Sequence, residues 1–411
     1  MKIWIFNHYA TAPNHVGGTR HYDLAAQLIS RGHEVTIIAS SFNHVQKQEM
    51  CAYDNQSSVK KETINGVKYL WIKTAAYSGN LKRIINILGY TKRAYQAAKR
   101  ELKSDKPDIV IGSSVHPLTA YIGYLIAKKS KSHFYFEERD LWPQTFVDFG
   151  KLSENSLIAK ALYKFEKFLY TKAKKIIVLF GNAPNYVTSR NIDRDKVIYL
   201  PNGVNMDNFK EPQKVPELTQ TMEKYRYTVV YTGSHGLANH LEPLIETAEL
   251  LQNKHGNTDI QFVLIGHGPL KEKLINLAKQ YRLTNVTFLD SITKDQIPYF
   301  LSLADLSFIS IKKSPLYKWG FSMNKIFDYM AAGLPIMVYS DKETAGELNS
   351  VEGAVVSETP EELADAVMQY MYSDDSGRSE ALKQYVASTY SWETLAVELE
   401  SHMLRDMEQG E

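Results

Sequence analysis

The feature that most limits how this chain can fold is a repeated alternation of short apolar runs with longer amphipathic stretches. This alternation is typical of βα units, in which helices join the strands of a parallel sheet. In the first half of the chain the predicted strands are Lys2–Phe6, Glu34–Ala39, Val67–Lys73, Asp108–Gly112, His133–Glu138, Lys175–Leu179 and Val197–Leu200. In the second half they are Tyr227–Tyr231, Ile260–Ile265, Val286–Leu289, Leu306–Ile309, Pro335–Val338 and Ala354–Val356. The sequence therefore predicts an α/β protein.

Proline and glycine interrupt the alternation near the middle, at Pro201-Asn-Gly203 and again across Glu211–Pro216. Residues of this kind are typical of a linker between domains. We therefore expect two doubly wound domains at 1–203 and 225–385, a linker at 204–224 and a C-terminal helical segment at 386–411. Doubly wound sheets bind ligands beyond the carboxyl ends of their strands, so two such domains facing each other would form a cleft.

The composition excludes several other classes of protein. Among 411 residues, 44% are hydrophobic and 23% charged, which is typical of a globular chain and not of a disordered, collagen-like or coiled-coil one. A single cysteine, Cys51, allows no internal disulfide and suits a reducing compartment. The longest apolar runs fall short of the ~20 residues that span a bilayer. We expect a cytoplasmic protein.

Two glycine-rich turns are candidate ligand sites. Gly17-Gly18 precedes a predicted helix, where backbone N–H groups favour an anion and Arg20 would add a cation; an ordinary turn with a solvent-facing arginine is the alternative. Gly266-His-Gly268 follows a strand, but Lys271 stands where a dinucleotide fingerprint has its third glycine. A nucleotide base packed against this turn and Ile292 is the interpretation we favour over a nicotinamide cofactor.

The most informative stretch is 320–335, Gly-Phe-Ser-Met-Asn-Lys-Ile-Phe-Asp-Tyr-Met-Ala-Ala-Gly-Leu-Pro, in which a loop passes into a helix. Lys325 falls in the first helical turn, where a cation opposes the helix dipole unless an anion is bound. Asp328 lies three residues on, along the same face, and could accept hydrogen bonds from a ribose diol. The alternative is that Lys325 and Asp328 merely pair with each other.

These motifs together resemble family-4 glycosyltransferases, which are retaining enzymes with two facing Rossmann-like domains, the GT-B fold. The matching motifs are Gly17-Gly18, Arg31-Gly-His-Glu-Val35, Pro201-Asn-Gly-Val204, Thr232-Gly-Ser-His-Gly236 and Met330-Ala-Ala-Gly333. They follow the family's order across nearly the whole chain. Asp140-Leu-Trp-Pro143 is similar to a bacterial subgroup that builds O-antigen, capsule and related surface polysaccharides.

The chain departs from the family pattern at three places. Members commonly carry two glutamates eight positions apart before the Met-Ala-Ala-Gly turn, and here Gly320 and Asp328 stand at those positions. The usual arginine and lysine of the second domain's first loop are replaced, in that neighbourhood, by Ser234 and His235. The resemblance then assigns donor binding to residues from both domains: Gly17, Gly18, Arg20, Gly233, Ser234, His235, Gly266, Gly268, Ile292, Phe321, Ser322, Met323, Asn324, Lys325 and Asp328.

The resemblance also suggests catalytic residues. Lys325 would stabilise the leaving diphosphate, and Asp140 and His116, each after a predicted strand, would approach the sugar or acceptor. Asp140 as a helix cap and His116 as an ordinary loop histidine are the alternatives. No cluster of histidine, cysteine or aspartate with metal-ligand spacing stands out in the sequence, so we expect no metal and no cofactor, the nucleotide sugar being a substrate.

Positive charge is concentrated in the first half, although the whole chain carries only +2. Leu81–Lys106 has a net charge of +6 with interleaved isoleucine and tyrosine, and Lys151–Lys175 has +5. Such segments can lie on anionic lipid, whereas no nucleic-acid motif accompanies them. A solvated helix face is the alternative.

The expected function is transfer of a sugar from a nucleotide diphosphate sugar, with UDP the expected nucleotide, to a polyprenyl-diphosphate-linked or other saccharide acceptor. The first domain would hold the acceptor, at the inner face of the plasma membrane. A same-fold nucleotide-sugar epimerase or hydrolase, or a non-catalytic nucleotide-sugar-binding protein, is the alternative.

Overall fold

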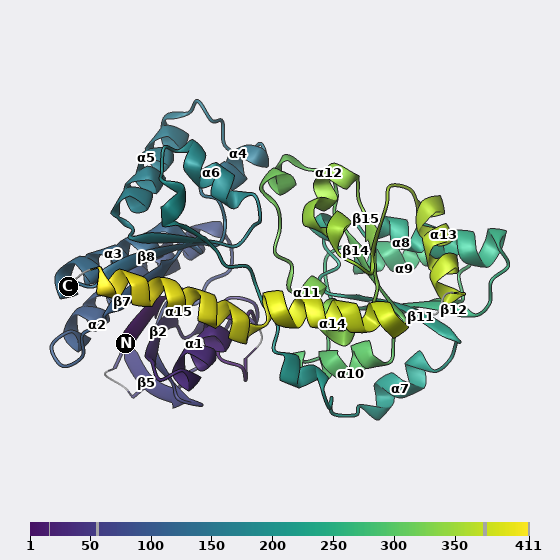
Figure 1. The fold of residues 1–411 in the computed structure, drawn as a ribbon, viewed down its shortest axis with the longest axis horizontal. Helices are drawn as coiled ribbons and strands as arrows, with labels where there is room; N and C mark the ends of the chain where they lie inside the picture. Colours follow the sequence, from purple (N-terminus) through teal and green to yellow (C-terminus); the bar gives the residue numbers. More distant parts are fainter. Residues whose placement is uncertain (16, 55–56, 373–375, 410–411) are drawn as a thin grey trace. The chain divides into compact units, whose positions relative to one another are not determined.

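A computed structural model of the chain describes residues 1–15, 17–54, 57–372 and 376–409. The chain forms two compact units, drawn in Figure 1. The first unit comprises Met1–Pro201 together with Trp392–Glu411, and the second comprises Asn202–Ser391. Each is an α/β unit with its own sheet and core, so the predicted fold class is confirmed.

The first unit is built on an eight-stranded sheet with the order β10-β9-β8-β7-β1-β2-β6-β5. All neighbouring strands are parallel except β5 and β6, which form an antiparallel hairpin. The strands are β1 (Lys2–Phe6), β2 (Glu34–Ser40), β5 (Val59–Ile64), β6 (Val67–Ile72), β7 (Ile109–Ser113), β8 (His133–Glu138), β9 (Lys175–Val178) and β10 (Val197–Tyr199). A small separate hairpin joins β3 (Phe42–Asn43) to β4 (Gln48–Glu49).

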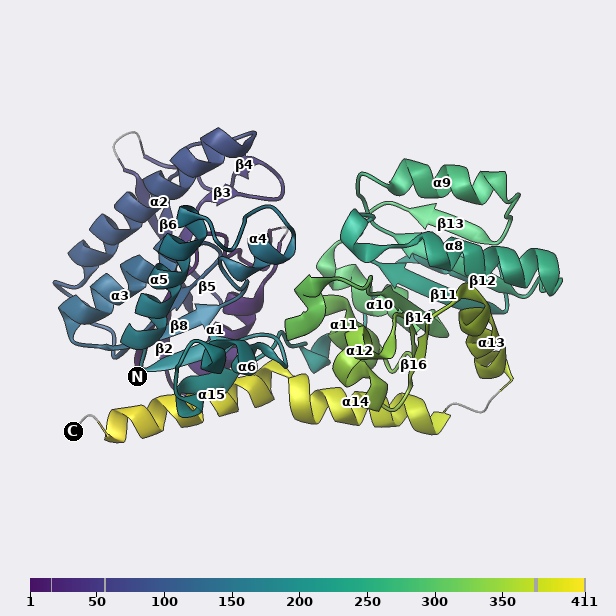
Figure 2. The same cartoon turned by 90° about the horizontal axis from the view of Figure 1, so that it is seen from above.

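Helices cover both faces of this sheet (Figure 2). Alternation along β1 directs Ile3 and Ile5 to the face covered by α1 and α15, and Trp4 to the opposite face. The helices are α1 (Arg20–Ser30), α2 (Asn80–Glu101), α3 (Pro117–Ser130), α4 (Gln144–Asp148), α5 (Leu157–Lys172), α6 (Ala183–Ser189) and α15 (Trp392–Glu408).

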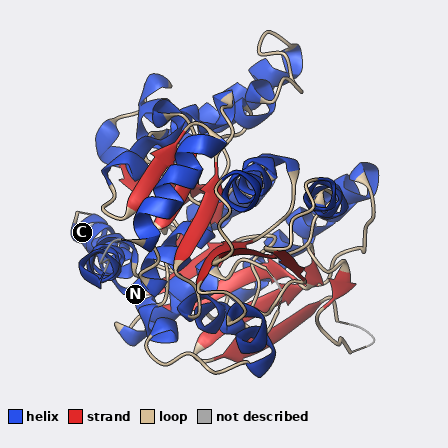
Figure 3. Ribbon diagram, turned by 90° about the vertical axis from the view of Figure 1, so that its right-hand side faces the viewer, coloured by secondary structure: helices blue, strands red, loops and turns tan. Residues whose placement is uncertain are grey.

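The second unit has a six-stranded, wholly parallel sheet with the order β13-β12-β11-β14-β15-β16. The strands are β11 (Tyr227–Thr232), β12 (Ile260–Ile265), β13 (Val286–Leu289), β14 (Leu306–Ser310), β15 (Ile336–Tyr339) and β16 (Ala354–Ser357). The helices are α7 (Pro216–Met222), α8 (Glu242–Glu249), α9 (Lys271–Gln280), α10 (Ile297–Ser302), α11 (Asn324–Ala332), α12 (Lys342–Ala345), α13 (Pro360–Met371) and α14 (Ser376–Tyr390). Figure 3 shows the resulting helix–sheet layers.

Residues 204–224 are part of the second unit and not the expected linker. Val204 pairs with Ser391 in an isolated bridge, and Leu218 and Met222 are buried in the core that also contains α11 and α14. The apolar side chains of Leu218 and Met222 explain why this segment is not a linker, because their burial in the core stabilises the folded unit. The C-terminal segment 386–411 is likewise divided, since α14 packs in the second unit and α15 in the first.

The edge strand β5 has no counterpart among the predicted strands. It is joined to β6 by Asn65 and Gly66, which have φ of 48° and 84°. Asn-Gly is the preferred pair for a two-residue hairpin turn, because both positions need positive φ.

No helix in the described ranges is long and apolar enough to cross a bilayer.

Candidate functional site

The second unit's site forms where β11, β12 and α11 meet at the carboxyl edge of its sheet. Lys325, in the first turn of α11, donates from Nζ to Tyr231 Oη at 2.8 Å and to Asn239 Oδ1 at 3.0 Å. The same amine lies 4.2 Å from the centre of the Tyr231 ring. Burial lowers the pKa of Lys325 to about 7. Among the described residues the hydrogen-bond partners of Lys325 are both neutral and no carboxylate affects its pKa, so the alternative, a Lys325–Asp328 ion pair, is not formed.

No side chain caps the N-terminus of α11 in the described part of the chain. Its N-cap residue, Met323, is extended and supplies no side-chain acceptor to the first helical N–H groups. Such N–H groups, together with the positive end of the helix dipole, favour a bound phosphate. Asn324 is exposed at this end, and Asp328 is half-buried one turn further along the helix. The predicted diphosphate-binding residues therefore lie on one helix beside the sheet edge.

Two glycine loops form the other wall of this site. Gly233, after β11, and Gly266, after β12, have φ of 137° and 149°. A Cβ on Gly266 would lie 1.8 Å from the Gly233 carbonyl oxygen, and one on Gly268 would lie 2.4 Å from the His235 carbonyl oxygen. His235 N–H donates to the His267 carbonyl at 2.9 Å. Only glycine allows backbones to approach so closely, and the structure thus brings together four predicted residues.

His235 is fully buried beside these glycines, next to Ser234. Neither of its ring nitrogens has a hydrogen-bond partner among the described residues. Burial, with the nearby charges of Lys271, His267 and Lys325, lowers the pKa of His235 to about 4, so the ring is neutral at pH 7. A buried polar group without a partner is unusual in a folded protein and is the kind of group that a ligand satisfies.

The loop before α11 is anchored to the start of the second unit. Asn202 N–H donates to Ser322 Oγ at 2.8 Å, and Asn202 Nδ2 donates to the Ser322 carbonyl at 2.9 Å. The Pro201-Asn-Gly203 motif therefore positions the loop that carries the predicted donor contacts. Phe321, Met323 and Ile292 pack partly buried against the core around α11.

In the first unit, Arg20 is not available to a donor, contrary to the sequence-based expectation. Its guanidinium is buried, with Nε donating to Glu137 at 2.9 Å and Nη2 donating to the Leu200 carbonyl at 2.8 Å. Nη1 donates to the Pro201 carbonyl. Arg20 therefore fastens the end of the first unit to α1 instead of facing solvent.

The remaining first-unit predictions lie at the carboxyl edge of the sheet. Gly17 has φ of 142°, and a Cβ there would lie 2.8 Å from Thr11, whereas Gly18 has open space. Asp140 follows β8 with an exposed side chain. It does not cap the following helix, because Pro143 occupies the N-cap position of α4.

His116 belongs to a buried aromatic cluster that the sequence analysis missed. Its Nε2 lies 2.8 Å from His8 Nδ1, and burial lowers the pKa of His116 to about 3. The His8 ring stacks on Tyr9 and on Tyr90, with centroids 4.4 Å and 4.1 Å apart. The sequence does contain a signal for this cluster, the run Asn7-His8-Tyr9 directly after the first strand. Polar residues at that place lie at the carboxyl edge of the sheet, where ligands bind.

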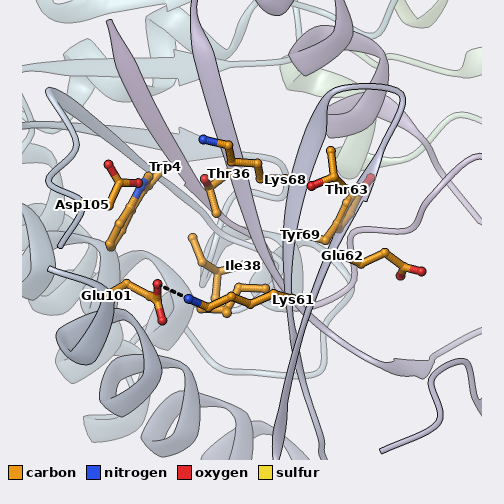
Figure 4. A pocket seen from close by; sticks show the side chains of 11 residues that line it. Trp4, Thr36, Ile38, Lys61, Glu62, Thr63, Lys68, Tyr69, Glu101 and Asp105 are labelled. Atoms are coloured by element: carbon orange, nitrogen blue, oxygen red, sulfur yellow. Dashed lines mark hydrogen bonds and ion pairs between the residues drawn. The ribbon is translucent and has the colours of Figure 1, made fainter. Parts of the chain in front are cut away.

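A hollow of about 260 Å³ elsewhere in the first unit contains none of the predicted site residues. Figure 4 shows its walls on β1, β2, β5, β6 and the end of α2, with Lys61 and Glu101 paired at 2.6 Å. It opens on a sheet face and not at the carboxyl edge. In the part of the chain that the structure describes, no cluster of three metal-ligating side chains is present.

Comparison with known protein families decides the identity of the chain. Residues 17–208 match the family model described as Glycosyltransferase Family 4, and residues 226–373 match the one described as Glycosyl transferases group 1. The chain belongs to the family-4 glycosyltransferases of the GT-B fold. The first match covers most of the first unit and ends at residue 208 in the second, and the other match lies within the second unit, so both units carry sequence typical of the family.

The glycosyltransferase is similar to enzymes of surface polysaccharides. WcaI of Escherichia coli (strain K12), whose name gives it as a glycosyl transferase of colanic acid biosynthesis, is 21% identical over 300 residues, covering 71% of this chain and 72% of WcaI.

Solved structures share its fold. Sucrose-phosphate synthase of Thermosynechococcus elongatus has a TM-score of 0.71 at 16% identity, with full coverage of both chains. HepE of Anabaena, solved in complex with UDP, has a TM-score of 0.68 at 11% identity and covers 98% of this chain and 100% of its own. WaaG, a glycosyltransferase involved in lipopolysaccharide biosynthesis, has 0.61 at 13%, covering 97% and 98%.

Proposed function

We propose that this glycosyltransferase moves a sugar from a UDP-sugar to a saccharide acceptor, with retention at the anomeric carbon and without a metal ion. The acceptor is a growing bacterial surface polysaccharide, carried on a polyprenyl diphosphate at the cytoplasmic face of the membrane. The likeness to WcaI and to WaaG supports a surface polysaccharide as the acceptor. The UDP bound to HepE supports UDP as the nucleotide of the donor.

The observation that carries the proposal is the Lys325 amine, which pairs with no carboxylate among the described residues and lies in the first turn of α11, a helix without a side-chain N-cap. As the bond between sugar and diphosphate breaks, negative charge grows on the leaving phosphate. Preorganised N–H donors and a cation stabilise that charge most strongly when it is fully developed, which lowers the barrier. These groups supply the positive charge that a metal ion supplies in other transferases.

The donor's other parts have matching surroundings in the second unit. The Gly266–Gly268 loop and Ile292 take the base, and Asp328 accepts hydrogen bonds from the ribose hydroxyls. His235, buried with both ring nitrogens unsatisfied among the described residues, is placed to hydrogen-bond to the diphosphate or the sugar. Gly320 stands where relatives carry a glutamate, so the sugar ring relies on backbone groups of residues 321–324.

Retention follows from a front-face displacement in which the leaving phosphate accepts the proton of the acceptor hydroxyl. No side chain then has to act as the general base. Asp140, exposed at the carboxyl edge of the first unit's sheet, is the residue we assign to contact with the sugar or acceptor. His116 is buried and hydrogen-bonded to His8, and we assign it a positioning role at the same edge of the sheet.

The test begins with thermal shifts in UDP, GDP and ADP and their sugar conjugates, since a ligand that binds only the folded state raises its stability. We expect UDP and one UDP-sugar to stabilise the protein. Turnover of that UDP-sugar is then measured with and without a bacterial lipid extract. Transfer that depends on the extract supports the proposal, equal turnover without it indicates an epimerase or hydrolase, and no turnover in either case indicates a binding protein.

A further inference from the structure

Two buried carboxyl groups of the first unit have no part in the proposed mechanism. Glu138 is the last residue of β8 and is 1% exposed, and Glu166, on α5, is 4% exposed. Tyr170, one turn after Glu166 on the same helix, contacts both acids. Its Oη donates to Glu138 Oε2 and lies 3.5 Å from Glu166 Oε1. Glutamate is seldom buried unless it has partners, so the position of this pair calls for a physical reason.

Glu138 also holds the chain that follows it. Residues 139–143 join β8 to α4, and we call them the Asp140 segment. The backbone N–H of Trp142, near the end of this segment, hydrogen-bonds to the Glu138 carboxyl group. The segment therefore turns back on the end of the strand from which it starts.

The start of α4, directly after the Asp140 segment, is held by α5 and α6. Gln144 Oε1 accepts hydrogen bonds from Tyr163 Oη at 2.9 Å and from Arg190 Nη2 at 3.1 Å. Tyr163 lies on α5, and Arg190 is the C-cap residue of α6. The Arg190 guanidinium also lies 4.4 Å from the centre of the Tyr163 ring. The Asp140 segment is thus anchored at both ends.

The charges around the two buried acids favour a proton on Glu138. Arg190 Nε lies 3.6 Å from Glu166 Oε2, and Tyr186 Oη donates to Glu166 Oε1 at 2.5 Å. Glu138 forms no ion pair with any cation in the described part of the chain. Burial, followed by the charge of Glu166, raises the pKa of Glu138 well above its usual range, and the charge of Asp140 adds to this.

Asp140 depends on its backbone for its position. Its side chain is exposed, and within the described ranges no other side chain hydrogen-bonds to it. The direction of its carboxylate is therefore set by the segment that carries it, and that segment is anchored on Glu138. An ionised Glu138 would also place a second negative charge beside Asp140, which a protonated Glu138 does not.

We propose that protonated Glu138 is a positioning residue for Asp140. It accepts the Trp142 N–H and the Tyr170 hydroxyl, and so fixes the Asp140 segment without adding charge to the carboxyl edge of the sheet. The proposal rests on the proposed function, which assigns Asp140 to contact with the sugar or acceptor. It gives a reason for burying a carboxyl group at the end of β8.

The test is a double-mutant cycle read as kcat/KM for the acceptor at saturating UDP-sugar. Glu138→Ala should lower this value about 10- to 100-fold, since it removes the partner of two buried donors. In an Asp140→Ala background the same substitution should lower it less than about threefold further, because a positioning residue acts through the residue it positions. An equal loss in both backgrounds would overturn the proposal.

The conservative variant Glu138→Gln separates positioning from charge. Its amide oxygen accepts the same two hydrogen bonds and cannot ionise, so it should keep kcat/KM within about threefold of the wild type. The wild-type rate should fall as Glu138 loses its proton, at a pH above the usual range of a carboxyl group, and Glu138→Gln should lack this fall. A fall common to both proteins belongs to other groups. Activity as low as that of Glu138→Ala would contradict the proposal.

A control variant excludes a loss of activity through general destabilisation. Leu399→Ala truncates a buried side chain of the first unit's core on α15, outside the Glu138 network. Below its unfolding temperature it should keep acceptor kcat/KM within about twofold. If Glu138→Ala does not fold, Tyr170→Phe replaces it in the cycle, because it removes one hydrogen bond to Glu138. Its expected loss is about 3- to 10-fold, again confined to the background that retains Asp140.

A measurement on the free protein keeps this proposal separate from the proposed function. The protein is labelled with fluorotryptophan, and the Trp142 signal among its five tryptophans is assigned with Trp142→Phe. The fluorine shift of Trp142 should titrate with pH in the wild type and not in Glu138→Gln. The same titration in both proteins would overturn the role of the Glu138 proton. A wild-type protein that shows the expected titration but transfers no sugar would contradict only the proposed function.

Discussion

At the scale of single residues, the proposed chemistry depends on Lys325, which pairs with no carboxylate among the described residues. Its amine hydrogen-bonds to two neutral groups, Tyr231 and Asn239, and burial depresses its pKa to about 7. A lysine paired with a carboxylate would be protonated, but its positive charge would already be balanced before the donor binds. If Lys325 binds the diphosphate as we propose, the negative charge of the diphosphate favours the protonated amine, so donor binding and protonation of Lys325 are linked.

This linkage predicts a pH dependence of UDP affinity. Above pH 7 the free amine of Lys325 is neutral and UDP binding must take up a proton, so affinity should fall as pH rises from 7 to 9, by at most about 10-fold per pH unit. Titration calorimetry in buffers of different ionisation enthalpy measures the uptake. Lys325→Ala should bind UDP with little change over this range, and an equal slope in both proteins would contradict the assignment.

Folding stability should respond to the same group with a definite sign. In the unfolded chain Lys325 keeps a pKa near 10.5, whereas in the folded chain the value is about 7. Between these values the unfolded state binds more protons, so the Lys325 contribution to stability rises with pH across that window and is lost as pH falls through 7. The effect belongs to the ligand-free enzyme and is reduced when UDP is bound.

Asp328 is predicted to act on donor binding and not on the chemical step. Asp328→Ala should raise the KM for the UDP-sugar about 10- to 100-fold, the value of one or two hydrogen bonds to a charged group, and leave kcat within about threefold. Steady-state kinetics with varied donor measure both. The KM of Asp328→Asn, which keeps one acceptor oxygen, should lie between the KM of the wild type and that of Asp328→Ala. A fall in kcat at unchanged KM would show that the ribose assignment is wrong.

At the scale of elements, the site depends on two loops that touch through their backbones. Gly268 and Gly266 leave no room for a Cβ against the loop that holds Gly233 and His235. The strands that carry these loops, β11 and β12, are adjacent and in register over six residue pairs. The sheet therefore fixes the spacing of the loops, and glycine lets them close on each other.

Gly268→Ala should accordingly impair nucleotide binding. Its Cβ would lie 2.4 Å from the His235 carbonyl, so one loop must move away, and we expect at least 10-fold weaker UDP binding. Gly377→Ala, in α14 with no atom of the described residues within 4 Å of the new Cβ, is the matched control and should leave UDP affinity unchanged. Wild-type affinity in Gly268→Ala would mean that these loops do not contact the nucleotide.

The positions of the elements could be predicted from the sequence because apolar periodicity depends on local spacing. Every predicted strand is present, and α11 begins one residue before Lys325. The side-chain partners could not be predicted in this way. Arg20 contacts Glu137 and the Leu200 carbonyl, which are more than a hundred residues away in the sequence. Lys325 on α11 contacts Tyr231 on β11 and Asn239 in a short turn of helix after that strand. Such contacts depend on tertiary packing, which a linear pattern does not contain.

At the scale of the whole molecule, the chain leaves the first unit at Pro201 and returns to it at Trp392. The returning helix, α15, buries Trp392, Leu395, Leu399 and Met403 in the first unit's core. Tyr135 Oη also donates to Asp406 on this helix at 2.6 Å. The first unit therefore needs the last helix of the chain to complete its core, whereas the second unit is continuous in sequence.

Leu399→Ala should thus destabilise the first unit alone. A buried leucine truncated to alanine costs about 2–5 kcal/mol, and Leu399 is fully buried. Urea unfolding followed with and without UDP should show an earlier first-unit transition while UDP still stabilises the second. Val397→Ala, at a side chain 42% exposed, should change stability by no more than about 0.5 kcal/mol. A parallel loss in both units would contradict this division.

The most direct test of the central claim compares the transfer rates of the wild type and Lys325→Ala at saturating donor. The substitution removes one buried amine with two neutral partners, so the melting temperature should change by only a few degrees. If Lys325 stabilises the departing diphosphate, kcat should fall about 100-fold or more. Sugar transfer by a folded Lys325→Ala enzyme at the wild-type rate would contradict the account.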